Sequence, residues 1–271
     1  MNMKFSKSTL MSGNDYPLTS SITLHHPTIR EMLNINQGHD SEQIYWNYIH
    51  LLLSDPYANM VFLDDIGKNF METSPFEVFL LQWDNLYQNY MEHKAFYDKM
   101  AFHPFSSITS ALQFFIAEDH DFVKSQYEDG SFCLVDRNNA SCQINQEIYE
   151  YIYQWVKSIH KIDYSGRIQP QDENARRILI EDTRSEIKKQ SRKKEKNNDD
   201  VNYIGSLMSA VSFGGNGVIT PFHLNDCKMY WLFEAFSIEN KKSNASHILD
   251  GLYHGTLSSK DIDKKELDWT K

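Results

Sequence analysis

The stretch Ser74-Pro75-Phe76-Glu77-Val78-Phe79 decides the fold, because it marks the start of a helix unusually well. Ser74 is a good N-cap residue, Pro75 fits the first helical position, and Glu77 stands where a capping box needs a carboxylate. Apolar residues then recur at helical spacing: Phe79, Trp83, Leu86 and Tyr90. The pattern predicts one long helix over residues 75–102, about 40 Å in length. Its aromatic stripe must be covered, so we expect a helical core around it.

The composition is that of a folded, acidic chain. Of the 271 residues, 41% are hydrophobic and 24% are charged, which is typical of globular proteins. The formal net charge of −10 argues against a general affinity for nucleic acid or anionic membranes. No stretch approaches the ~18 consecutive apolar residues of a membrane-spanning helix. The three cysteines, Cys133, Cys142 and Cys227, lack metal-ligand spacing and fit buried thiols in a reducing compartment, so we expect a cytoplasmic protein.

Short β-strands are expected at three places. Alternating β-branched residues predict one strand near 22–24, and a short apolar run predicts a second near 60–63. The run Phe132-Cys133-Leu134-Val135 predicts a third over 132–135. The first two could pair with each other, and residues 141–144 could pair with the third. The predicted fold class is therefore mainly α with a small β component (α+β).

Further helices are expected around the long one. Capping residues and apolar periodicity place them at 28–34, from Asp40 to Asp55, and at 146–161, 172–196, 201–211 and 246–252, with another behind Thr220-Pro221. Changes in composition divide the chain into three parts. Residues 1–165 form an N-terminal mixed helical domain with the small sheet, 166–200 a charged helix or linker, and 201–271 a C-terminal helical subdomain.

A basic run lies within the charged segment. Over residues 188–196 a single acid, Glu195, accompanies six cations: Lys188, Lys189, Arg192, Lys193, Lys194 and Lys196. Such a run usually forms a solvated helix end or a mobile linker. The alternative is a patch for nucleic acid or for an acidic partner, although no aromatic residues are interleaved for base stacking.

No catalytic constellation is evident in the sequence. The chain has no H-E-x-x-H, C-x-x-C, P-loop or G-x-S-x-G pattern. His39-Asp40 and His120-Asp121 are dipeptides of the kind found in metal-dependent phosphohydrolases, but both have loop-like surroundings, where a structural role is favoured. We therefore expect no enzyme activity, no cofactor and no metal. A metal hydrolase centred on His120-Asp121 is the competing hypothesis.

Aromatic side chains are the best candidates for binding a partner. Trp269 follows a polar stretch, so it must either pack back on the protein or meet another chain. The other candidates lie on apolar helices or at their ends: Tyr230, Phe233, Tyr253 and Trp46.

Two sets of segments carry a resemblance to known proteins. The first is residues 22–31 (ITLHHPTIRE), followed by Asp55-Pro56, by residues 63–67 (LDDIG) and by the helix start at 74–79. The second is residues 219–226 (ITPFHLND), continued by 252–256 (LYHGT) and 264–269 (KKELDW). Together they resemble proteins encoded in the tail modules of long-tailed phages (siphoviruses) and prophages of Gram-positive bacteria. Those proteins are usually taken to be tail assembly chaperones.

The resemblance implies a non-enzymatic protein of the bacterial host cytoplasm. It would bind the phage tape measure protein and tail tube subunits during tail morphogenesis, and self-association is compatible with that role. A tape measure protein is long and largely helical, so a protein that holds it needs apolar grooves and adaptable side chains. The 10 Met and 15 Tyr suit such grooves. The alternative is another structural or regulatory tail-module protein, or a nucleic-acid-associated factor that uses residues 188–196.

Overall fold

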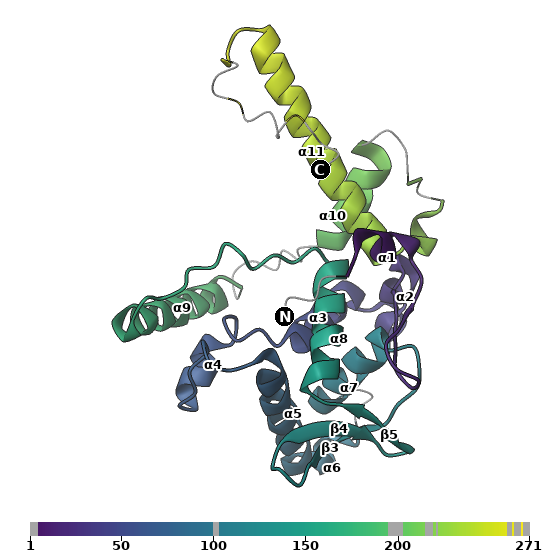
Figure 1. Ribbon diagram of the computed structural model, residues 1–271, viewed down its shortest axis with the longest axis vertical. Coiled ribbons are helices and arrows are strands. Elements are labelled where there is room, and N and C mark those ends of the chain that lie inside the picture. The colour runs from purple at the N-terminus through teal and green to yellow at the C-terminus, as the bar shows by residue number, and fades with distance from the viewer. Residues whose placement is uncertain are drawn as a thin grey trace.

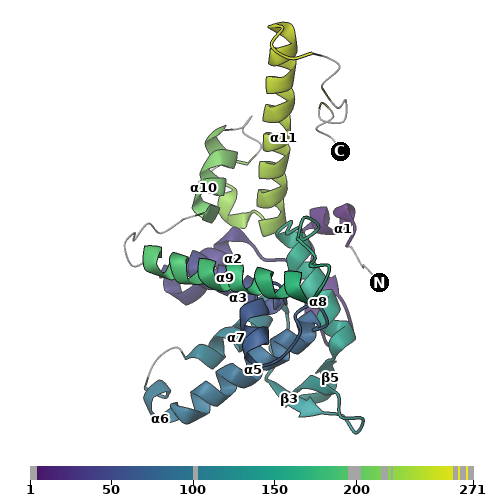
Figure 2. The same ribbon diagram turned by 90° about the vertical axis from the view of Figure 1, so that its left-hand side faces the viewer.

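The computed structural model describes residues 5–99, 103–194, 203–214, 219–220 and 222–258, together with Ile262 and Leu267. Helices dominate the body, and two small antiparallel sheets lie at separate places in it (Figure 1). The last helix, α11 (Met229–Tyr253), leaves this body and projects from it in both ribbon views (Figures 1 and 2). The fold is mainly helical with a small β component, as the sequence predicts.

Four helices form the centre of the body: α3 (Ser41–Leu53), α5 (Pro75–Glu92), α7 (Pro104–Phe115) and α8 (Gln146–Ile159). Their largest buried side chains are aromatic: Tyr45, Phe79, Phe115, Tyr149 and Trp155. The Tyr149 hydroxyl donates to the Leu52 carbonyl at 2.6 Å, and the Trp155 indole N–H donates to the His25 carbonyl at 2.8 Å. These rings therefore fill the core without leaving their polar atoms unpaired.

The helix start predicted at Ser74 is confirmed, but the predicted helix length is wrong. The Ser74 hydroxyl accepts from the Glu77 N–H at 3.2 Å, and the Glu77 carboxylate accepts from the Ser74 N–H at 2.8 Å. The helix ends at Glu92, and a separate turn, α6 (Lys94–Tyr97), follows. The last buried residue of α5 is Trp83. Leu86 and Tyr90 are still half-buried, but the side chains of residues 91–96 are all exposed. Packing therefore no longer holds the chain in one straight helix there, and propensity alone is too weak to do so.

The strand predicted near 60–63 is also wrong. These residues form α4 (Met60–Asp65), a short helix whose Met60 and Leu63 are buried. They pack with Phe70, with Val78 of α5 and with Ile180 of α9 (Glu173–Lys194). A run of four apolar residues fits a buried strand and a buried helical turn equally well, and here the contact with α9 selects the helix.

The strands predicted at 22–24 and 132–135 are present. β2 (Thr23–Leu24) pairs with β1 (Tyr16–Pro17), and not with residues 60–63; α1 (Lys7–Ser12) precedes them. β4 (Phe132–Asp136) is the central strand of an antiparallel sheet, between β3 (Phe122–Gln126) and β5 (Asn139–Ile144). β3 and β5 are therefore edge strands, each paired with β4 along one of its two edges.

The charged helix α9 lies across the body (Figure 2) and contacts α4 (Figure 1). The Arg184 guanidinium contacts the Asp64 carboxylate at 3.1 Å and the Asp65 carboxylate at 2.8 Å. Ile180 is its buried apolar contact, whereas Ile178 and Ile187 are exposed. Buried Ile180, half-buried Leu179 and a few ion pairs thus hold this helix in place.

The C-terminal part joins the same core. It contains α10 (Tyr203–Ser209), a π-helical turn η2 (Ala210–Gly214), a 3-10 turn η3 (Leu224–Asp226) and α11. The helices expected behind Thr220-Pro221 and at 246–252 are one helix, which begins only at Met229. Ile204, Leu207 and Leu232 belong to one hydrophobic cluster with α3, α8 and α1. α2 (Ile29–Leu33) and the 3-10 turn η1 (Ile35–Gly38) complete the body.

Candidate partner-binding surface

Residues 22–31 and 219–226, two of the segments that carry the sequence resemblance, meet near the start of α11, where the Arg30 guanidinium contacts the Asp226 carboxylate at 2.8 Å. The Ile29 N–H donates to the Cys227 carbonyl and the Met229 N–H donates to the Pro27 carbonyl, both at 2.9 Å. These bonds form an antiparallel bridge between the start of α2 and the start of α11. Residues that are far apart in sequence therefore build one support at the foot of α11.

Glu234, a buried carboxylate, anchors the base of α11. The ammonium groups of Lys7 and Lys161 reach it at 2.5 and 2.6 Å, from α1 and from the end of α8. Burial alone would raise the pKa of Glu234, but the two cations outweigh it and hold that pKa below its ordinary value. The Trp231 indole N–H also donates to the Met11 carbonyl at 3.0 Å. α11 thus leaves the body from a firmly bound base.

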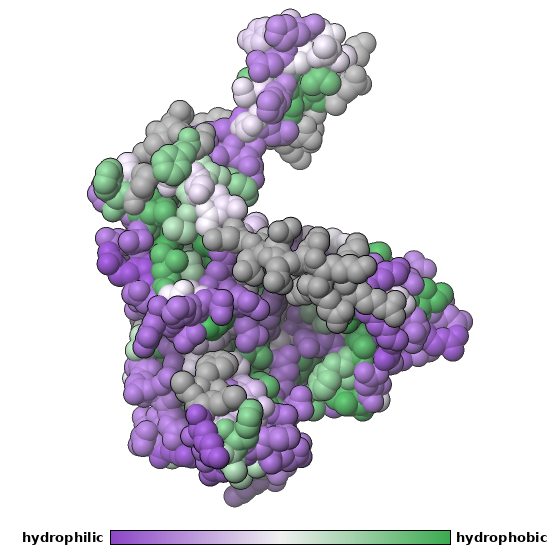
Figure 3. All heavy atoms as spheres, turned by 180° about the vertical axis from the view of Figure 1, so that it is seen from behind, coloured by the Kyte–Doolittle hydropathy of each residue, from purple (hydrophilic) through white to green (hydrophobic). Residues whose placement is uncertain are grey.

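Beyond this base, residues 240–258 form a projecting segment that we call the arm (Figure 1). Apolar residues recur along it at helical spacing: Ala245, Ile248, Leu249, Leu252 and Tyr253. Leu249 is 41% exposed and Tyr253 is 84% exposed. Figure 3 shows a hydrophobic patch near the outer end of the arm, among hydrophilic neighbours. An apolar stripe held away from the body marks a surface for another chain.

A tight cap ends the arm. Gly255 adopts a left-handed conformation with φ of 68°, which favours glycine. The N–H groups of Thr256 and Leu257 donate to the Gly251 carbonyl at 2.9 and 3.1 Å. A Cβ added at Gly251 would meet Leu257 Cδ1 at 2.6 Å. The cap therefore keeps the partly exposed Leu257 beside the apolar stripe.

Two of the predicted aromatic residues come together at the base of α11. The Trp46 ring centroid lies 5.9 Å from that of Tyr203 and 6.4 Å from that of Phe233. A hollow of about 390 Å³ lies beside them, lined in part by Tyr203, Phe233 and Phe236. Tyr230 is buried, and its hydroxyl donates to Glu234 at 3.4 Å, so its side chain belongs to the core and offers no surface.

The two remaining aromatic candidates, Tyr253 and Trp269, lie in different parts of the chain. Tyr253 lies on the arm, and Trp269 lies outside the described residues. The structure adds Phe213 and Phe222, which are 78% and 92% exposed in the turns before α11. Neither belongs to a periodic apolar pattern, so only the fold reveals that they face solvent.

The basic run is described only in part. Lys188 and Lys189 are exposed on the last turns of α9. Arg192, Lys193 and Lys194 lie in the same helix, and Lys196 lies outside the described residues. The described part places two cations on a solvated helix surface, and a role in nucleic-acid binding stays a prediction.

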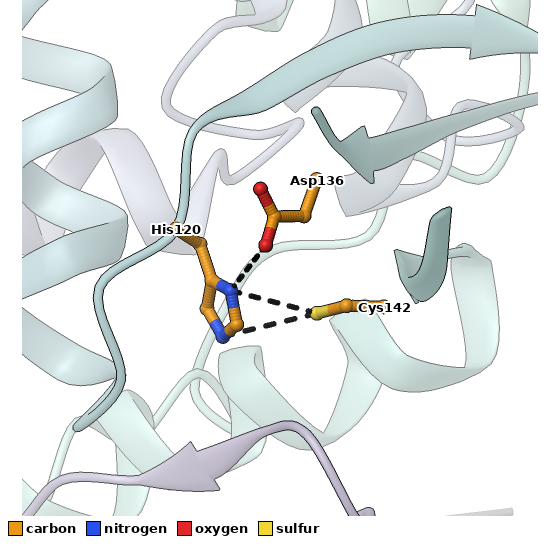
Figure 4. A group of neighbouring side chains, drawn as sticks. All are labelled: His120, Asp136 and Cys142. Carbon is orange, nitrogen blue, oxygen red and sulfur yellow. Dashed lines mark hydrogen bonds and ion pairs between the residues drawn. The ribbon is translucent and has the colours of Figure 1, made fainter. Parts of the chain in front are cut away.

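His120 lies in a polar cluster with Asp136 and Cys142 (Figure 4), whereas the Asp121 carboxylate pairs with Arg137. Its Nδ1 contacts Asp136 Oδ2 and its Nε2 contacts the Ser21 carbonyl, each at 2.9 Å. The Cys142 sulfur lies 3.8 Å from both ring nitrogens. All three side chains are almost fully buried. The cluster ties the three-stranded sheet to the turn that precedes β2.

Among the described residues, His120, Asp136 and Cys142 are the group that could hold a metal ion, with donor atoms within 4.8 Å of one another. An ion bound to a ring nitrogen lies in the ring plane, along that nitrogen's lone pair. A sulfur equidistant from both nitrogens lies towards Cε1 or over the ring face, so it would stay about 4 Å from the ion, against ~2.3 Å in a zinc–sulfur bond. Burial also raises the pKa of the Cys142 thiol, whereas a ligand must be a thiolate. The geometry fits a hydrogen-bonded network better than a metal centre.

Comparison with known proteins gives no relative for this chain. No protein-family model matches it, and comparison with curated proteins and with solved structures finds no significant match. None of the described helices combines the length and the apolar character needed to span a membrane. The functional argument therefore rests on the sequence and the geometry of the chain itself.

Proposed function

We propose that this protein is a non-enzymatic tail assembly chaperone of a long-tailed phage. It holds the tape measure protein and recruits tail tube subunits while the tail is built. The arm carries the proposal, because its apolar residues Leu249 and Tyr253 are exposed to solvent on a helix that leaves the body. The contact between residues 22–31 and 219–226 supports it, since the Arg30 guanidinium meets the Asp226 carboxylate at 2.8 Å beside the foot of the arm.

The arm suits a helical partner. Leu249, Leu252 and Tyr253 are spaced to enter the groove of a second helix that lies along the arm. Full burial of each such side chain contributes about 1.5–3 kcal/mol, and association costs several kcal/mol of lost freedom. Three such side chains therefore leave at most about 5 kcal/mol, so the stripe alone binds no more tightly than about 0.2 mM and a chaperone could release its partner readily.

The hollow lined in part by Tyr203, Phe233 and Phe236 extends the same surface to the body. Its aromatic side would receive an apolar side chain of the partner near the foot of the arm, beside Lys161 and Lys241 on its polar side. The exposed ring of Phe222 lies in the turn that leads into α11. A partner helix could thus contact the arm and its foot together, with more area than the arm alone provides.

Co-expression with the tape measure protein of the same tail module tests the proposal. We expect the tape measure protein to stay soluble and to copurify with this chain. An unrelated acidic helical protein, expressed at the same level, serves as the control. If the tape measure protein aggregates equally with either companion and forms no complex, the proposal is wrong.

A further inference from the structure

A second surface, distant in sequence from the arm, lies along the outer edge of β3. The Arg137 N–H donates to the carbonyl of Asp121, the residue before β3, at 3.0 Å. In an antiparallel pair every second residue bonds to the neighbouring strand, so the odd-numbered residues of β3 are the ones that bond to β4. The backbone groups of Phe122, Lys124 and Gln126 consequently point away from β4. Within the described chain, the N–H and C=O groups of these three residues have no hydrogen-bond partner. The edge therefore offers a row of backbone donors and acceptors.

An aromatic groove of about 490 Å³ runs beside this edge. Its wall is formed by Trp83 and Tyr87 of α5 and by Phe105 of α7. The Phe105 ring centroid lies 5.0 Å from that of Trp83 and 5.2 Å from that of Tyr87. The rings of each pair meet edge to face, which is a favourable arrangement. Tyr87 and Phe132 are both partly exposed at the groove. The wall is already formed and has room for apolar side chains.

Charges at the groove are matched within the protein. The Lys124 ammonium contacts the Asp84 carboxylate at 2.5 Å, and the Arg137 guanidinium contacts the Asp121 carboxylate at 3.3 Å. Lys124 also lies over the Phe132 ring, 4.1 Å from its centroid. With two cations matched by two carboxylates, this surface has no excess charge to attract a charged ligand. Its complement is an uncharged segment.

The position of Lys124 argues against a second copy of this chain as the occupant. Antiparallel pairing of two β3 strands about their centre would place the two Lys124 side chains opposite each other, which is unfavourable. A different chain with a small polar residue at that position meets no such repulsion.

We propose that β3 binds an extended, uncharged segment of another protein as a fourth strand of the sheet. Its backbone would pair with Phe122, Lys124 and Gln126, and its alternate apolar side chains would enter the aromatic groove. Five residues of β3 span about 17 Å, so the bound segment has about five residues in register. This site stands whether or not the arm binds a tape measure protein.

A selection from random twelve-residue peptides, made on the immobilised full chain, tests the proposal. Synthetic copies of the enriched peptides are then titrated by fluorescence polarisation against two matched variants. Lys124→Pro removes one outward N–H and leaves every bond to β4, whereas Lys124→Thr keeps that N–H. Both lose the contact with Asp84. We expect at least tenfold weaker binding by Lys124→Pro than by Lys124→Thr, and a similar loss with Tyr87→Ala.

Peptides methylated on alternate backbone nitrogens provide a second measurement that does not depend on the folding of any variant. One methylation register should abolish binding and the other should not, because only one set of N–H groups faces β3. The proposal is overturned if no peptide is enriched, if both lysine variants bind equally, or if both methylation registers bind alike. A dimer of the free protein that Lys124→Pro dissociates would also overturn it, because the edge would then hold a second copy.

Discussion

Acidification should destabilise this protein through His160, a buried residue at the end of α8. Its Nδ1–H donates to the Val156 carbonyl, and its Nε2 accepts from the Tyr45 hydroxyl, both at 2.6 Å. Both nitrogens of the neutral ring are therefore hydrogen-bonded. A proton added at Nε2 would face the hydrogen that the Tyr45 hydroxyl already donates to that nitrogen. Burial lowers the pKa of His160 from 6.5 to about 4.

The sign of the effect follows from which state binds the proton. Between about pH 6.5 and pH 4 the unfolded chain protonates this histidine and the folded chain does not. The stability contributed by His160 is therefore complete above about pH 6.5 and falls as the pH falls through this window. The pKa difference corresponds to about 2 kcal/mol of unfolding free energy lost between pH 8 and pH 5, and about 3 kcal/mol at lower pH.

Two other histidines also change how much unfolding free energy the protein loses in acid. Burial and then the Lys228 ammonium lower the pKa of His26 to about 4, so His26 adds to the loss in acid. His25 acts in the opposite direction: burial would lower its pKa, but Glu31 and Asp15 outweigh burial and raise it. His25 therefore contributes stability at low pH that is lost as the pH rises through its folded pKa. A variant of His160 isolates one contribution from this sum.

Urea unfolding followed by tryptophan fluorescence at pH 8 and pH 5 measures the effect. We expect His160→Gln to show a drop in unfolding free energy about 2 kcal/mol smaller than that of the unchanged protein. His247→Gln, on the exposed face of the arm, is the matched control and should leave the drop unaltered. An equal drop in the His160→Gln variant and the unchanged protein would refute the reasoning.

Further predictions concern stability at neutral pH. Gly13→Ala should cost about 2–3 kcal/mol of unfolding free energy, because φ is 68° and the new Cβ would meet the Trp231 ring at 2.6 Å. Gly67→Ala, at φ of 73° with nothing within 4 Å, should cost only about 1 kcal/mol; equal costs in denaturant titrations would contradict the contact with Trp231. Asp55→Asn breaks a two-point ion pair with the partly exposed Arg167 and should cost about 2 kcal/mol, and a change in thermal midpoint too small to measure would be evidence against it.

Local signals in the sequence predicted local structure well. The capping box at Ser74 and Glu77 depends on residues three positions apart, so the start of α5 could be recognised without knowledge of the fold. The end of α5 depends on where packing stops, after the half-buried Tyr90, and that is set by neighbouring helices. The helix at 60–65 has the same origin, because the contact of Met60 and Leu63 with α9 selects it.

The candidate surfaces depended still more on the three-dimensional arrangement. Tyr253 was recognisable as a candidate because it follows an apolar run, whereas Tyr230, in the first turn of the same helix, is buried by the body. The free edge of β3 could not be predicted, since it requires the strand order of the sheet. The pairing of His120 with Asp136 instead of Asp121 likewise required the fold to bring β4 beside the turn.

The affinity of the purified protein for a helical fragment of the tape measure protein tests the central claim most directly. Isothermal titration would compare the unchanged chain with Leu249→Asp, on the apolar stripe of the arm, and with Asn244→Asp, an exposed polar position on the same arm. Each variant adds one negative charge. The account predicts binding at least tenfold weaker for Leu249→Asp and unchanged within about twofold for Asn244→Asp. Equal affinity of all three proteins, or no binding by the unchanged chain, would contradict it.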